Sequence, residues 1–221
     1  LSLVGSEMCI RDRAEGSAID MLLEMSKEST MVVMGSRGLS GISGMVLGSV
    51  SGAVVSHASC PVVVVREDNA VTEENKYGPV VVGVDGSEVS RRATEVAFEE
   101  AAARGAELHA VHTWVDTQIQ GPGAGYAVSE DHWKAVQAEK DELLSSYLNE
   151  LSEQYPDVVV KKAITRDRPV RALAAAAQGA QLLVTGSHGR GGFKGMLLGS
   201  TSRALLQEAP CPMMVVRTQD L

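Results

Sequence analysis

The chain has 221 residues, of which 44% are hydrophobic, and it carries a formal net charge of −8. This length and apolar content fit one large or two small globular domains and exclude a disordered chain. The acidic balance argues against nucleic acid or an anionic membrane surface as the main partner, and no apolar stretch approaches the roughly 20 residues that a membrane span needs.

Residues 1–13 do not fit the pattern of the rest of the chain. The sequence opens without Met, and this stretch lacks the alternation of a strand. We interpret residues 1–13 as a non-native leader that resembles translated adapter sequence, which predicts an N-terminally truncated gene product. Because neither a signal peptide nor a lipidation motif is visible, we expect a cytoplasmic protein.

Residues 14–66 and 79–217 both alternate between apolar strand patterns and helix patterns, and residues 67–78 form a polar, acidic linker between them. The predicted elements are, in chain order, helix 18–27, strand 30–34, helix 49–56, strand 62–65, strand 80–84, helix 88–104, strand 107–114, helix 131–154, strand 158–164, a helix from 168, strand 181–185, helix 202–208 and strand 213–216. The alternation predicts an α/β fold, with a doubly wound, five-stranded parallel sheet in residues 79–217 and the back half of such a domain in residues 14–66. Strand 30–34 is wholly apolar, which is typical of a strand buried on both faces.

The two parts repeat one another at a constant offset of 151 residues, so we call residues 14–66 the first copy and residues 79–217 the second copy. The matching segments are Gly35-Ser36-Arg37-Gly38 with Gly186-Ser187-His188-Gly189, Gly48-Ser49 with Gly199-Ser200, and Cys60-Pro61 with Cys211-Pro212. A period this long indicates the duplication of a domain rather than a solenoid repeat. We interpret the two repeated cysteines as small buried residues at the start of a strand.

The glycine-rich stretch 186–201 follows an apolar strand and leads into a helix, an order that favours an anion site. Glycines let backbone N–H groups turn toward a ligand, and the free N–H groups at a helix start attract phosphate. Asp85 ends the first strand of the second copy, and ligands of such sheets bind where the strands end. The sequence therefore predicts a nucleotide between Asp85 and this stretch. In the alternative interpretation, Asp85 caps the next helix and the glycines serve turns only.

These motifs resemble the universal stress protein family, in its nucleotide-binding branch. The family signature is Gly, two residues, Gly, nine residues, then Gly followed by Ser or Thr. It is matched in the second copy by Gly186, Gly189, Gly199 and Ser200, and in the first copy by Gly35, Gly38, Gly48 and Ser49. Val82–Ser87 resembles the family's first-strand motif. The likeness implies a tandem, ATP-binding regulator whose complete sheet is Rossmann-like, with strand order 3-2-1-4-5.

The resemblance also implies a role for each residue of the site. Asp85 would lie by the ribose or adenine, with Gly83 allowing close approach and backbone groups around Thr113 holding the adenine edge. The residues expected around the triphosphate are Gly186, Ser187, His188, Gly189, Arg190, Gly191 and Gly192, closed by Gly199, Ser200 and Thr201. Mg²⁺ would accompany the phosphates of ATP, or of ADP or AMP. The first copy keeps its glycine-rich loop but lacks a counterpart of Asp85. This predicts one complete nucleotide site, in the second copy, and one impaired site, in the first copy.

Three functions stay open. The first is a non-enzymatic sensor of ATP or AMP in the stress response, because no catalytic base or nucleophile is identifiable from spacing. The second is a slow Mg²⁺-dependent ATPase or an adenylyl-transfer enzyme of the same superfamily. The third is a dimerisation module that binds no nucleotide and pairs domains through their final strands. We expect a homo-oligomer or a pseudo-dimer formed by those strands.

Overall fold

The computed structural model describes residues 16–37, 47–73, 75–114, 130–190 and 197–218. The helices are α1 (Ala18–Met25), α2 (Ser49–His57), α3 (Glu88–Arg104), α4 (Glu130–Gln154), α5 (Pro169–Ala176) and α6 (Ser200–Glu208). The strands are β1 (Val32–Gly35), β2 (Val62–Val65), β3 (Val80–Gly83), β4 (Leu108–Thr113), β5 (Val160–Thr165), β6 (Leu182–Gly186) and β7 (Met213–Val216). The predicted leader, residues 1–13, lies outside the described residues and stays a prediction.

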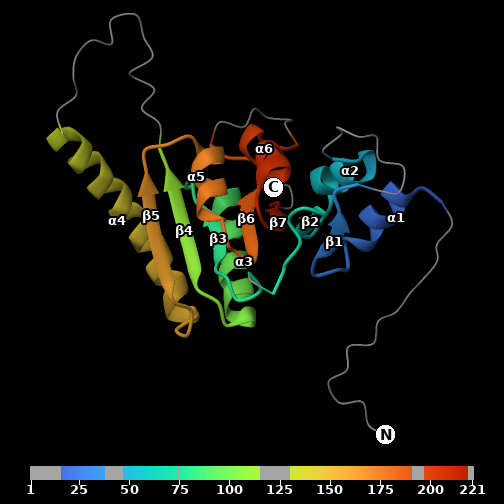
Figure 1. Cartoon of the computed structure of the whole chain (residues 1–221), viewed down its shortest axis with the longest axis horizontal. Helices are drawn as coiled ribbons and strands as arrows, with labels where there is room; N and C mark the ends of the chain where they lie inside the picture. Colours follow the sequence, from blue (N-terminus) through green and yellow to red (C-terminus); the bar gives the residue numbers. More distant parts are fainter. Residues whose placement is uncertain (1–15, 38–46, 74, 115–129, 191–196, 219–221) are drawn as a thin grey trace, which may run out of the picture.

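The strands form one seven-stranded sheet in the order β1-β2-β7-β6-β3-β4-β5 (Figure 1). Every neighbouring pair is parallel except β2 and β7, which are antiparallel. Numbered within the second copy, its five strands follow the order 3-2-1-4-5. The predicted α/β fold is confirmed, and the five strands of residues 79–217 are parallel to one another, as expected. The strands β1 and β2 of the first copy extend this sheet beyond β7 to seven strands.

Successive side chains of the central strands enter two separate hydrophobic clusters, one on each face of the sheet. Val80 and Val82 of β3 pack in one cluster with residues of α3 and α4, such as Phe98 and Leu148. Val81, which lies between them, packs in the other cluster, to which α2, α5 and α6 contribute. This alternation is what a strand buried on both faces requires, and it explains the unbroken valine runs. None of the helices in the described ranges is long and apolar enough to cross a membrane.

The prediction that strand 30–34 is buried on both faces is wrong. The strand, β1, lies at one end of the sheet and its residues alternate between half-buried and exposed. Val33 is 61% exposed, whereas Val184, its counterpart in the second copy, is fully buried. The two strands have the same apolar character, but β6 has a paired strand on each side and β1 pairs with β2 alone among the described residues.

The repeat found in the sequence is also a repeat of hydrogen bonds. The equivalent pairs are Ser36 N to Val65 O (2.9 Å) with Ser187 N to Val216 O (2.7 Å), Gly48 N to Ser36 O (2.8 Å) with Gly199 N to Ser187 O (2.7 Å), and Ser51 Oγ to Gly35 O (2.8 Å) with Ser202 Oγ to Gly186 O (2.6 Å). The second and third pairs tie the start of α2 or α6 to the end of the preceding strand, and the first pair joins that strand end to the final strand of the copy. Each copy therefore builds the same strand–loop–helix frame.

The two copies join through their final strands, β2 and β7, and this strand pair is pseudo-symmetric. Val63 lies opposite Met214, its own counterpart by the repeat, which is the register of a two-fold axis. Just after β2, Arg66 donates to the carbonyl of Ala209 at the end of α6, at 2.8 Å. Arg217, its counterpart after β7, donates to the carbonyl of Ser56 near the end of α2. We expected the final strands to pair in a homo-oligomer or a pseudo-dimer, and in this structure β2 and β7 pair within one chain.

Asn69, in the predicted linker, is buried at this junction and is 4% exposed. Its side-chain amide donates to the carbonyls of Ala209 (3.2 Å) and Cys211 (2.8 Å). Its Oδ1 accepts from the backbone N–H of Arg66, at 2.7 Å. One side chain therefore satisfies three backbone groups of two different copies.

We expect Asn69→Ala to lower the free energy of unfolding by about 2 kcal/mol, because it removes the side-chain donor to the carbonyl of Cys211 and the acceptor for the backbone N–H of Arg66, while Arg66 still donates to the carbonyl of Ala209. Urea unfolding followed by circular dichroism measures this change. Asn149→Ala, at an exposed position of α4, is the control and should change stability by less than about 0.5 kcal/mol. Equal loss in both variants would mean that Asn69 does not hold the junction together.

Candidate functional site

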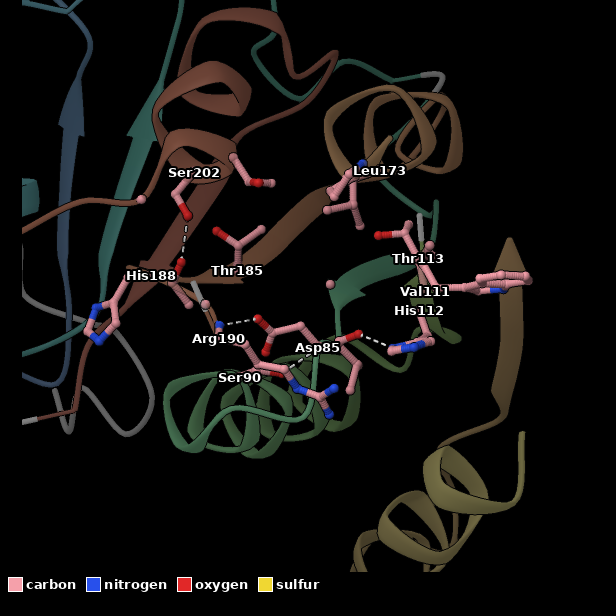
Figure 2. Close-up of a pocket in the computed structure, with 18 of the residues that line it drawn as sticks. Asp85, Ser90, Val111, His112, Thr113, Leu173, Thr185, His188, Arg190 and Ser202 are labelled. Carbon is pink, nitrogen blue, oxygen red and sulfur yellow. Dashed lines mark hydrogen bonds between the residues drawn. The ribbon is translucent and has the colours of Figure 1, made fainter. Parts of the chain in front are cut away.

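A cavity of about 460 Å³ lies at the carboxyl ends of β3, β4 and β6 (Figure 2). Its volume is within the usual range for a small-molecule site. β3 lies between β4, which follows it in the chain, and β6, which belongs to the other half of the domain. The cavity is therefore at the position where the strand order reverses, where sheets of this kind bind ligands.

Asp85 connects the end of β3 to the glycine-rich loop after β6. Its Oδ2 accepts a hydrogen bond from the backbone N–H of Arg190, at 3.0 Å. Its Oδ1 accepts from the backbone N–H and the hydroxyl of Ser87, at 2.9 and 2.7 Å. The alternative in which Asp85 caps α3 is wrong, because Ser87 is the N-cap and accepts from Ser90 N.

The carboxyl group of Asp85 is charged at neutral pH. Burial alone would raise its pKa, but the hydrogen bonds from Ser87 and from the Arg190 backbone, together with the Arg190 charge, outweigh burial and lower the pKa. An ionised carboxylate has about four lone-pair positions. Three donors reach Asp85, so room remains for one more donor, such as a hydroxyl of a ligand.

The glycines of the site let separate elements approach closely. A Cβ on Gly189 would overlap Oδ2 of Asp85, and a Cβ on Gly199 would lie 3.2 Å from the Cα of His188. A Cβ on Gly83 would lie 3.0 Å from a methyl group of Leu173, which lines the cavity from α5. A Cβ on Gly189 would force the Asp85 carboxylate to move, and a Cβ on Gly199 or Gly83 would make a contact tighter than usual, so glycine favours these close approaches before any ligand is considered.

The first turn of α6 faces the same cavity. Its N-cap is Gly199, which has no side chain to accept from the first N–H groups of the helix, as Ser87 does for α3. Those N–H groups and the positive end of the helix dipole remain available to an anion. Ser200 and Thr201 line the cavity here and add two hydroxyl groups.

Thr185, which the sequence did not single out, is a further polar group of the cavity. It lies in β6 and is 5% exposed. Among the described residues, its hydroxyl is buried and has no hydrogen-bond partner. Because a buried, unpaired hydroxyl costs about 1–3 kcal/mol, a ligand that bonds to it would recover that free energy.

The strand β4 supplies the opposite wall through Val111 and the residues that follow it. Thr113 lines the cavity as expected, and so do His112 and Trp114, which the sequence analysis did not single out. Nδ1 of His112 lies 2.7 Å from the carbonyl oxygen of Val84. Since a carbonyl only accepts, this nitrogen carries the proton and the ring is fixed to the end of β3. No motif marks these residues, so only the strand pairing identifies them.

Ten of the predicted site residues line the cavity: Gly83, Asp85, Thr113, Gly186, His188, Gly189, Arg190, Gly199, Ser200 and Thr201. Ser187 does not line it. That residue is 1% exposed, and its hydroxyl lies 3.0 Å from Nδ1 of His188. In Figure 2 the imidazole of His188 points away from Asp85. Gly191 and Gly192 lie outside the described residues.

Of the residues of the first copy that the structure describes, none lines this cavity. Gly35, Gly48 and Ser49 are not among its lining residues, and Gly38 lies outside the described residues. Within the described parts of both copies, no group of three or more His, Cys, Asp or Glu side chains is arranged to hold a metal ion.

The lowered pKa of Asp85 predicts a specific pH dependence of stability. A carboxyl group with a depressed folded-state pKa contributes stability that is complete above its ordinary pKa of about 4 and is lost as pH falls through the folded-state value. We therefore expect the stability advantage of the wild type over Asp85→Asn to shrink as pH falls from 7 to 3. Urea unfolding at both pH values measures it. A constant difference would contradict the assignment of the stabilising bonds to the charged carboxylate.

Comparisons with known proteins agree on one family. The model of the universal stress protein family matches residues 4–66 and 76–217. A universal stress protein of Mycobacterium tuberculosis is 43% identical over 218 residues, which cover 97% of this chain and 72% of the relative. A second one from the same species is 43% identical over 203 residues, which cover 91% of this chain and 63% of the relative.

A solved structure supports the same conclusion. The crystal structure of a universal stress protein from Archaeoglobus fulgidus matches with a TM-score of 0.60 and 26% identity, over 91% of this chain and 66% of that chain. The family match covers both copies of the repeat, including the loops that suggested it. The chain therefore belongs to the universal stress protein family.

Proposed function

We propose that this chain is an adenine-nucleotide-binding regulator of the stress response, with its nucleotide site in the cavity of the second copy. Family membership supports the stress-response role. The observation that carries the nucleotide proposal is that Asp85 and the first turn of α6 line one cavity. A carboxylate for the sugar and a helix start for the phosphates are the two polar groups that a nucleotide needs.

The order of groups across the cavity also supports a nucleotide. In Figure 2, Ser202 and His188 lie at one end, Val111 and Thr113 lie at the other, and Asp85 lies between them. The end with Ser202 and His188 would take the phosphates, the end with Val111 and Thr113 would take the base, and Asp85 between them would contact the ribose. At the base end, the side chains of Val111 and Leu173 offer apolar contact for the faces of adenine.

A divalent ion fits this site only through the ligand. The described lining residues offer the hydroxyls of Ser200 and Thr201, and Asp85 already accepts from three donors. Mg²⁺ commonly binds through phosphates and keeps several waters, so it would be held by the nucleotide together with these hydroxyls. When bound, it would neutralise phosphate charge.

The first test compares equivalent glycines of the two copies. Gly199→Val places a branched side chain against His188 and over the first turn of α6, so we expect ATP affinity to fall more than tenfold. Gly48→Val changes the counterpart in the first copy, where a Cβ would lie 3.4 Å from the carbonyl of Ser36, and we expect unchanged ATP affinity. Isothermal titration calorimetry measures both. Equal ATP affinities in the two variants would contradict the assignment of the nucleotide site to the second copy.

The second test separates the sugar from the phosphates. Asp85→Ala removes a charged acceptor, which is worth about 1.5–3 kcal/mol, so we expect ATP and AMP to bind at least tenfold more weakly, both by a similar factor. Calorimetry with both ligands measures this. A loss confined to ATP would place Asp85 at the phosphates instead.

The same preparation distinguishes a regulator from an enzyme. Bound nucleotide identified by mass spectrometry, with negligible turnover in the presence of Mg²⁺, supports the regulator. Robust metal-dependent hydrolysis of ATP supports the enzyme, and no affinity for any adenine nucleotide contradicts the proposed function.

A further inference from the structure

The hydroxyl of Thr185 is a polar group that the fold itself does not use. Its oxygen is buried and, among the described residues, has no hydrogen-bond partner. The residues before it in β6, Leu182–Val184, are all apolar and buried. A valine at this position would have nearly the same shape and the same preference for a strand, without an unpaired hydroxyl. The threonine therefore costs stability in the ligand-free protein.

The first copy shows that the strand–loop–helix frame does not need this hydroxyl. At the offset of 151 residues the counterpart of Thr185 is Met34, which packs against the hydrophobic cluster that contains Val64 and Leu205. The three hydrogen bonds that repeat in the two frames involve neither of these two side chains. The polar residue thus occurs in the copy that has the cavity, as expected for a contact to a ligand.

Thr185 faces the cavity from the side of the sheet that carries α5 and α6. Val82 lies opposite Val184, and both side chains enter the cluster on the α3 and α4 side. Because side chains alternate along a strand, the next residue of β6, Thr185, points to the other side and lines the cavity there. In Figure 2, Thr185 and Asp85 both lie between Ser202 and Val111, and so between the phosphate end and the base end.

Asp85 and Thr185 together match the two hydroxyl groups of a ribose. Asp85 accepts from three donors and has one acceptor position left. Thr185 can donate one hydrogen bond and can also accept one. One ribose hydroxyl can therefore donate to Asp85, while the neighbouring hydroxyl bonds to Thr185. A deoxyribose can make only one of these two contacts.

We propose that Thr185 is a specificity-determining residue that binds a ribose hydroxyl, so that the cavity selects ribonucleotides over deoxyribonucleotides. The inference rests on the proposed nucleotide site and adds the part of the ligand that β6 recognises. A site built to hydrogen-bond a ligand hydroxyl rejects an analogue that lacks it, because the buried polar group of the protein is then left unpaired. A deoxynucleotide leaves Thr185 as unpaired as it is in the empty cavity.

The test titrates ATP, 2′-deoxy-ATP and 3′-deoxy-ATP into the wild-type chain and into Thr185→Val, by isothermal titration calorimetry. We expect Thr185→Val to weaken ATP binding about tenfold or more. One of the two deoxy analogues should bind the variant and the wild type equally, because it lacks the hydroxyl that Thr185 contacts. Thr185→Ser keeps the hydroxyl and is the control, with an ATP affinity within about threefold of the wild type.

Urea unfolding without ligand separates this role from a structural one. Thr185→Val removes an unpaired hydroxyl and should keep or raise the urea midpoint. Thr94→Val is the contrast, since Thr94 is also buried but its hydroxyl donates to the carbonyl of Ser90 at 2.8 Å, so its midpoint should fall. A lower midpoint for Thr185→Val would mean that the hydroxyl has a partner within the protein, and would overturn the proposal.

Two binding results would also overturn it. An equal loss of affinity for ATP and for both deoxy analogues in Thr185→Val would place the hydroxyl at the base or the phosphates. Unchanged ATP affinity in Thr185→Val would mean that the hydroxyl does not touch the ligand. In both cases the wild type still binds ATP, so the proposed function stands, whereas a wild type that does not bind ATP would contradict both.

Discussion

The hydrogen bond between Asp85 and the backbone of Arg190 is the contact on which the site depends. It joins two segments that are 105 residues apart in sequence, the end of β3 and the loop after β6. The bond forms only because Gly189 has no side chain to occupy the position of the carboxylate oxygen. With these ends fixed, the first turn of α6 faces the same space as the end of β4. The cavity is thus a consequence of strand order and of one missing Cβ.

The two copies show that a local motif is not a site. Each has the three glycines of the family signature and the same hydrogen bonds between its strand end and its helix start. What distinguishes them is the neighbouring strand. β6 lies beside β3, which ends two residues before Asp85, whereas β1 lies at the end of the sheet. A glycine-rich loop of this kind therefore lines a ligand-sized cavity only when a second strand ends beside it.

The dependence of the site on neighbouring strands also determines how much of it could be predicted from the sequence. Local patterns gave strands 62–65 and 213–216 and helix 88–104 at their observed bounds, because valine runs and Gly-bounded helices depend mainly on neighbours in the chain. The glycine spacing led to Asp85 and Gly199. Thr185 and His112 were missed, because their role comes from pairing with strands distant in sequence. The exposure of Val33 was missed for the opposite reason, the lack of such a pairing.

The antiparallel pairing of β2 with β7 has a consequence for how the two copies stay together. Both strands belong to one polypeptide, joined by the short segment that contains Asn69. Tethering of this kind gives the partners an effective concentration in the millimolar range, independent of how much protein a cell contains. Separate domains that used the same contact would come apart on dilution. Here the junction persists even for a single molecule.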